Sequence, residues 1–215
     1  MKETLAKAKH YSKWLWLLLF SYFGYLMLEI TLRYIPFHTD TAFLQIKQQE
    51  VTAITSYITF FYIHVYSALF VLLAGYTQFS SSLLERFPKL HRISGKVYAF
   101  IVLLLAAPSG IFIGYYANGG LSSQIAFILL GLLWFFFTLK GIIAIRKKAI
   151  IAHRNFMLRS FALALSAITL RLWKVILVYL FHPNPMDVYQ IIAWLGWIPN
   201  LILAEWLIRS KKQIK

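Results

Sequence analysis

Residues 121–145 read LSSQIAFILLGLLWFFFTLKGIIAI, and Lys140 is the single charged residue among them. Roughly 20 helical residues cross a bilayer core about 30 Å thick, so this stretch is long enough to span a membrane. Inside lipid every backbone N–H and C=O group must be paired within its own segment, which a helix achieves and an isolated strand does not. The stretch therefore predicts a transmembrane helix.

Similar apolar runs recur along the whole chain. The composition is 60% hydrophobic and 13% charged, whereas soluble chains carry roughly 25% charged residues. The predicted spans lie at residues 14–35, 51–76, 96–117, 121–145, 156–181 and 188–208. The first run follows a basic leader and has no small-residue cleavage site, so we interpret it as a retained span and not as a signal peptide. The expected fold class is an all-α, polytopic integral membrane helical bundle with six transmembrane helices, forming a single transmembrane domain over residues 1–215.

The basic residues gather in segments that alternate onto one side of the predicted bundle. Most of the 22 lysines and arginines lie in the leader, the tail and two links: Lys2, Lys7, Lys9, Lys13, Arg86, Lys89, Arg92, Lys96, Arg146, Lys147, Lys148, Arg154, Arg159, Arg209, Lys211, Lys212 and Lys215. Short loops rich in Lys and Arg stay in the cytoplasm, so both termini are expected there. The formal charge of +15 is then explained by topology and by attraction to anionic lipid headgroups on the cytoplasmic face, and not by a nucleic-acid partner.

Absent motifs narrow the possible chemistry. The chain has no cysteine, which excludes disulfides, iron–sulfur clusters, thiolate zinc sites and cysteine nucleophiles. It also lacks a G-x-x-x-x-G-K-[ST] phosphate loop, an H-E-x-x-H helix and a G-x-S-x-G nucleophile elbow. An ATPase or a hydrolase is therefore not expected.

Two motifs in the middle of the chain carry a family resemblance. The first, PKLHRISGKVY, covers residues 88–98, and the second, HRNFMLRS, covers residues 153–160. They follow His64 and the stretch LAGYTQF at 73–79, and they precede Arg171. Together these residues resemble the family of predicted bacterial and fungal membrane proteins called domain of unknown function 2306, over roughly residues 60–180. The resemblance implies a multi-pass protein of the cell membrane, expected to be the bacterial cytoplasmic membrane, and it brings no established activity.

Each motif contains a His–Arg pair at the cytoplasmic end of a predicted span. His91 and Arg92 precede the third span, and His153 and Arg154 precede the fifth. If the two hairpins are duplicates, both histidines face one another at one height, as the two axial ligands of a b-type haem iron must. The neighbouring arginines would then pair with haem propionates or with the head of a quinone. The plainer interpretation is that these side chains reach the headgroups and fix the span ends.

Three polar residues are predicted deep in the membrane. His64 lies about 13 residues into its span, hence roughly 20 Å from the outer edge, and intramembrane polar residues of this kind are functional candidates. Arg171 and Glu29 are expected at similar heights in the outer third, where buried charges are usually paired. An Arg171–Glu29 pair is one solution. Arg33, one helical turn after Glu29, is the competing local partner.

These patterns support three hypotheses. The paired His–Arg motifs favour a small redox protein that carries b-type haem on His91 and His153, or that handles a quinone beside them. Charge at depth supports a proton-coupled transporter or carrier with a polar core at His64, Arg171 and Glu29. The third hypothesis is a membrane scaffold or assembly factor whose polar core serves helix packing alone.

Overall fold

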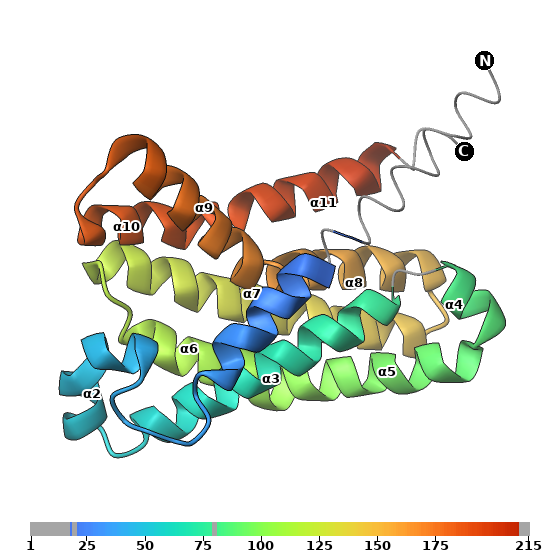
Figure 1. Cartoon of the computed structure of the whole chain (residues 1–215). Helices are drawn as coiled ribbons and strands as arrows, with labels where there is room; N and C mark the ends of the chain where they lie inside the picture. The colour runs from blue at the N-terminus through green and yellow to red at the C-terminus, as the bar shows by residue number, and fades with distance from the viewer. Residues whose placement is uncertain (1–17, 19–20, 79–80, 211–215) are drawn as a thin grey trace.

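The computed structural model describes residue 18 and residues 21–78 and 81–210, and every regular element within these ranges is a helix. A first helix (21–32) leads through a loop to the following elements, which are η1 (Ala42–Lys47), α2 (Gln48–Ala53), α3 (Tyr57–Gln78), α4 (Ser81–Arg86), α5 (Pro88–Ile101), η2 (Val102–Ala106), α6 (Ala107–Tyr115), α7 (Gly120–Arg146), α8 (Ile150–Ala164), α9 (Ser166–Phe181), α10 (Pro185–Leu195) and α11 (Ile198–Ser210). They run back and forth between two ends of an elongated bundle (Figure 1).

Four stretches of the described chain are long and apolar enough to cross a membrane: Tyr57–Gln78, Pro88–Tyr115, Gly120–Arg146 and Pro185–Ser210. Helices α8 and α9 make a fifth if the pair is one span, although it is bent by 41° at its break. These helices cover the second to sixth predicted spans. The first predicted span, 14–35, lies partly outside the described residues, so the count of six and the direction of the termini stay predictions.

The two ends of the bundle differ in charge. One end, here called the basic end, holds α4, the start of α5 and the α7–α8 link, and it carries Arg86, Lys89, Arg146, Lys147 and Lys148 (Figure 1). The opposite end holds α2 and the α6–α7 and α9–α10 links (Figure 1). The segregation that the sequence predicts along the chain is thus a segregation in space.

Three helical paths are interrupted within the described part of the bundle. A π-helical turn, η2, precedes Pro108, which has no N–H for the carbonyl of Leu104. Two turn residues, Gly196 and Trp197, separate α10 from α11. Leu165 separates α8 from α9, and Asn200 of α11 donates there to the carbonyl of Ala162 at 3.1 Å. A side chain that inserts into the backbone ladder in this way bends a helix.

Candidate functional site

A cavity of about 660 Å³ lies between the first helix, η1, α3, α6, α7, α9 and α10. It reaches from the end opposite the basic end, where Asn118 and Pro183 of two links line it, down to Ala106, Trp134 and Ala164 near the middle. Two of these deepest residues, Ala106 and Ala164, adjoin the helix interruptions at η2 and Leu165. The cavity therefore ends at the level where two of the surrounding helices are broken.

The cavity wall is mostly apolar and aromatic. Its aromatic residues are Tyr34, Phe43, Tyr57, Phe61, Phe127, Trp134 and Tyr189. Two ring pairs stiffen this wall beside η1, because Phe43 stacks on Phe61 at 6.0 Å and Phe61 meets Tyr34 edge-on at 5.3 Å. A largely apolar cavity with a few convergent polar groups is the usual form of a small-molecule site.

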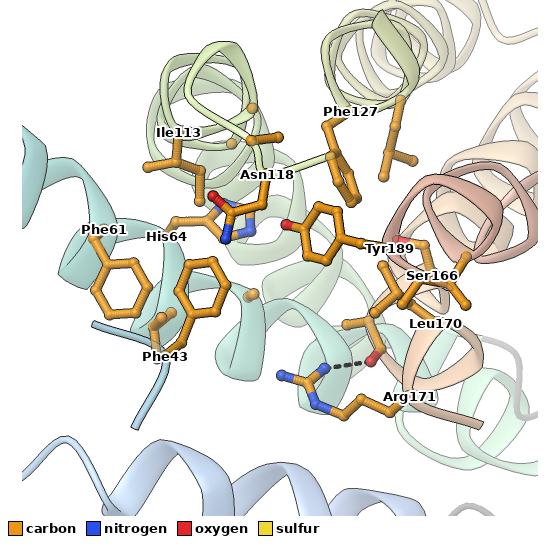
Figure 2. Close-up of a pocket in the computed structure, with 18 of the residues that line it drawn as sticks. Phe43, Phe61, His64, Ile113, Asn118, Phe127, Ser166, Leu170, Arg171 and Tyr189 are labelled. Atoms are coloured by element: carbon orange, nitrogen blue, oxygen red, sulfur yellow. Dashed lines mark hydrogen bonds between the residues drawn. The ribbon is translucent and has the colours of Figure 1, made fainter. Parts of the chain in front are cut away.

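His64 supplies one of those polar groups from α3. Its Nδ1 lies 2.9 Å from the carbonyl oxygen of Ala106. A carbonyl only accepts, so Nδ1 carries the hydrogen, and in the neutral ring Nε2 is an acceptor. Gly110 makes room for the ring, since a Cβ there would lie 2.8 Å from His64 Cε1. His64 is thus fixed against η2 and α6 while it lines the cavity (Figure 2).

Arg171 supplies a second polar group from α9. Its guanidinium donates to the carbonyl of Ala167 one turn earlier (Figure 2). Glu29 binds Arg33 instead, at 2.6 Å, and both of those side chains are largely exposed. Of the two pairings that the sequence left open, the structure has the local one, and the Arg171–Glu29 pair is absent. His64 and Arg171 share one cavity, whereas Glu29 does not line it.

Further polar residues at the cavity were not foreseen as part of a site. Asn118 and Tyr189 come from the α6–α7 link and from α10, and Figure 2 shows both beside His64. Lys47 of η1 is only 1% exposed; its Nζ donates to Glu50 at 2.6 Å and to the carbonyl of Tyr116. Lys174 lines the cavity one turn after Arg171. None of the four belongs to a recognisable motif, because they come from η1, the α6–α7 link, α9 and α10, which lie far apart in sequence.

The two predicted haem-ligand histidines lie elsewhere, towards the basic end. His153 Nδ1 is 2.8 Å from the carbonyl of Gly141, and His91 Nδ1 is buried without a hydrogen-bond partner in the described structure. The two imidazoles are close enough for their charges to interact. Arg92 and Arg154 are exposed. Neither histidine lines the 660 Å³ cavity or a second one of about 440 Å³ on α11, so their role as ligands stays a prediction.

The two family motifs meet in the core through their final residues. Tyr98 and Ser160 share a hydrogen bond of 2.8 Å, and Ser160 also bonds to Thr138 of α7 at 2.7 Å. All three side chains are buried. Arg159, which precedes Ser160 in the second motif, forms a two-point ion pair with Glu205 of α11. We call this region, where the C-terminal end of α3 meets α5, α7, α8 and α11, the packed half, and the region around the 660 Å³ cavity the cavity half.

Comparison with known proteins agrees with the motifs. A family model described as "Predicted membrane protein (DUF2306)" matches residues 61–208. The match extends past the expected limit at residue 180 and includes α10 and most of α11. Neither the curated proteins nor the solved structures give a match. Since the family model covers more than half of the chain, this protein belongs to the family of predicted membrane proteins named domain of unknown function 2306.

Proposed function

We propose that this protein is a membrane carrier whose 660 Å³ cavity receives a small ligand from one side of the membrane. The supporting observation is the cavity itself, which link residues line at one end of the bundle and which stops in the middle. The basic end is assigned to the cytoplasm because short loops rich in Lys and Arg remain there. The cavity then faces the outside.

The interrupted helices support transport in preference to simple binding. In many secondary transporters discontinuous helices line the substrate site near the midplane and permit alternating access. Here the breaks at η2 and Leu165 adjoin the cavity floor. Asn200 connects the break at Leu165 to the break at Gly196 and Trp197. Its Nδ2 donates to the carbonyl of Ala162, to Thr169 Oγ1 at 3.0 Å and to the carbonyl of Gly196 at 3.3 Å. Helices α9 and α10 then form a hairpin, and the breaks that flank it, Leu165 and Gly196–Trp197, lie at one level.

His64 is assigned as the proton-carrying group of the cycle. Histidine is the side chain that most readily exchanges a proton at physiological pH, and intramembrane histidines often serve as relays. The hydrogen bond from Nδ1 to Ala106 leaves Nε2 for that exchange. Ligand movement is therefore expected to be coupled to protons.

The absence of cysteine permits a clean test of access. In an Ala167→Cys variant the new thiol lies on the cavity wall, and a small membrane-impermeant thiol reagent is added to right-side-out and to inside-out vesicles. A carrier exposes the same residue to each side in turn, so labelling is expected from both. The matched control is Ala99→Cys, which lies in the packed half with 7% exposure and should not react. Labelling of Ala167→Cys from one side alone would mean that the cavity is a static pocket and that the protein is not a carrier. No labelling from either side would mean that the cavity is not accessible at all.

The redox hypothesis has one observation in its support, the buried and unpartnered Nδ1 of His91 near His153. It has less support than the carrier, because His153 Nδ1 is bound to Gly141 and both cavities are lined by other residues. An absorption spectrum of the purified protein decides the haem version. A preparation without a Soret band, unchanged by dithionite or added hemin, would eliminate it.

A further inference from the structure

The charged side chains that line the cavity are all cationic. The described residues that line it include Lys47, Arg171 and Lys174 but neither aspartate nor glutamate. Lys47 is neutralised by Glu50 at 2.6 Å. Arg171 and Lys174 therefore leave the cavity with positive charge that no lining carboxylate balances.

Arg171 is the cation best placed to act on a ligand. It lies ten residues before the C-terminal end of α9, hence roughly 15 Å inside the bundle from that end. A guanidinium has five N–H donors, and the hydrogen bond recorded for it is to the carbonyl of Ala167 on its own helix. Figure 2 shows its planar group directed into the cavity. Removing a cation from water is costly unless an anion compensates it, and Glu29, the partner expected from the sequence, is bound to Arg33.

The rest of the cavity wall is suited to the apolar part of a ligand. Across the cavity from Arg171, Figure 2 shows Phe43, Phe61 and Ile113, and Phe127 closes the side towards α7. A volume of about 660 Å³ falls within the range of pockets that enclose drug-sized molecules, roughly 300–1,000 Å³. The cavity thus combines a cationic contact on α9 with an aromatic wall on η1, α3 and α7.

We propose that the ligand is an amphipathic anion, with a carboxylate or phosphate head bound to Arg171 and an apolar body against the aromatic wall. This inference rests on the proposed carrier function and names the class of its substrate. A guanidinium fork matches the two oxygens of a carboxylate or phosphate, which gives both charge compensation and orientation. Lys174, one turn nearer the mouth, attracts the same head as it enters.

The test measures binding by the change in tryptophan fluorescence, since Trp134 lies at the cavity floor. Purified protein is placed in nanodiscs of neutral phosphatidylcholine, with empty nanodiscs to correct for partition into lipid. The probes are decanoate and decyl phosphate against decanol, and 2-naphthoate against 2-naphthalenemethanol. The anions should bind at least about tenfold more tightly than the matched alcohols, because a hydrogen bond to a charged group contributes at least that factor.

Three variants locate the effect. Arg171→Gln should weaken anion binding about tenfold or more, Arg171→Lys should retain part of the affinity, and Arg33→Gln, which alters an exposed arginine outside the cavity, should bind as wild type. Alcohols that bind as well as the anions, or an Arg171→Gln variant with unchanged affinity, would overturn the anion assignment while two-sided labelling of Ala167→Cys still supports the carrier. Tighter binding of decanoate than of 2-naphthoate would support the anion assignment and a ligand that comes from the membrane. Tighter binding of 2-naphthoate would support the anion assignment and a water-soluble ligand.

Discussion

Arg159 in the packed half and Arg171 in the cavity half differ in how their charges are compensated. Arg159 is held at two points by Glu205 and lies over the rings of Phe137 and Phe156, at 5.7 and 5.6 Å from their centroids. Arg171 has a backbone carbonyl as its recorded acceptor and faces a cavity without a lining carboxylate. The protein itself satisfies the first charge, whereas the second is the one that we propose binds an anion from outside. Internal satisfaction of polar groups indicates stability, and its absence beside a cavity indicates a ligand.

Glycines allow close helix packing in both halves, and one of them also makes room for a polar side chain. In the packed half, a Cβ on Gly75 would lie 2.2 Å from the ring of Phe161, and one on Gly141 would lie 2.7 Å from the sulfur of Met157. These glycines let helices approach closely, as small residues do in membrane proteins. In the cavity half Gly110 instead leaves space for the imidazole of His64. Gly114 and Gly131 of the cavity half also let α6 and α7 approach closely, since a Cβ there would lie 3.0 Å from Phe127 and 2.5 Å from Ile111.

The largest effect on the stability of the protein is expected from Gly75→Ala. The new methyl group overlaps a ring that is 6% exposed and enclosed by the core, so the helices must separate at a cost of about 3 kcal/mol. Unfolding in detergent, followed by circular dichroism, measures the loss. Gly24→Ala is the control, because its nearest neighbour would be 3.9 Å away. Equal stability of both variants would mean that close packing does not define this half.

Arg159→Gln should lower stability by about 1–2 kcal/mol. The ion pair is partly exposed, at 19% and 34% for the two side chains, so its contribution is well below that of a fully buried pair. The two-point geometry and the ring contacts raise it above an ordinary surface pair. Thermal unfolding in detergent is the measurement, and an unchanged midpoint would contradict the role given to the Arg159–Glu205 pair.

Tyr98→Phe should cost about 1 kcal/mol, since it removes the hydroxyl that bonds to Ser160 and receives the indole N–H of Trp134 at 3.4 Å. Tyr115→Phe, at a residue that is 61% exposed, should leave stability unchanged. A double-mutant cycle with Ser160→Ala isolates the pair. Additive effects of the two changes would show that the last residues of the two motifs do not interact.

The smallest effect on stability is expected from Arg171→Gln. No lining carboxylate loses its partner, and a costly buried charge is removed, so the unfolding midpoint in ligand-free detergent should stay the same or rise. A drop as large as that of Arg159→Gln would mean that Arg171 is a structural residue. The contrast between the two arginines would then disappear.

Much of the fold could be predicted because hydropathy and charge are local properties of the chain. The apolar runs from residue 51 onward correspond to described helices, and the basic links gather at one end. The motif residues were correctly identified as belonging to the family, but their partners were not. Nothing in the order of residues pairs Tyr98 with Ser160, or Arg159 with Glu205, since these contacts depend on how α5, α8 and α11 are rotated about their axes.

By itself, the sequence determined the all-helical membrane architecture, the family and the presence of His64 and Arg171 within helices. Only the tertiary structure decided that these two residues share a cavity, that Glu29 binds Arg33, and that Asn118 and Tyr189 join the site from the α6–α7 link and from α10. The physical reason is that a cavity is the space which side chains from distant segments leave unfilled. Its charge is likewise a sum over residues that no local pattern connects.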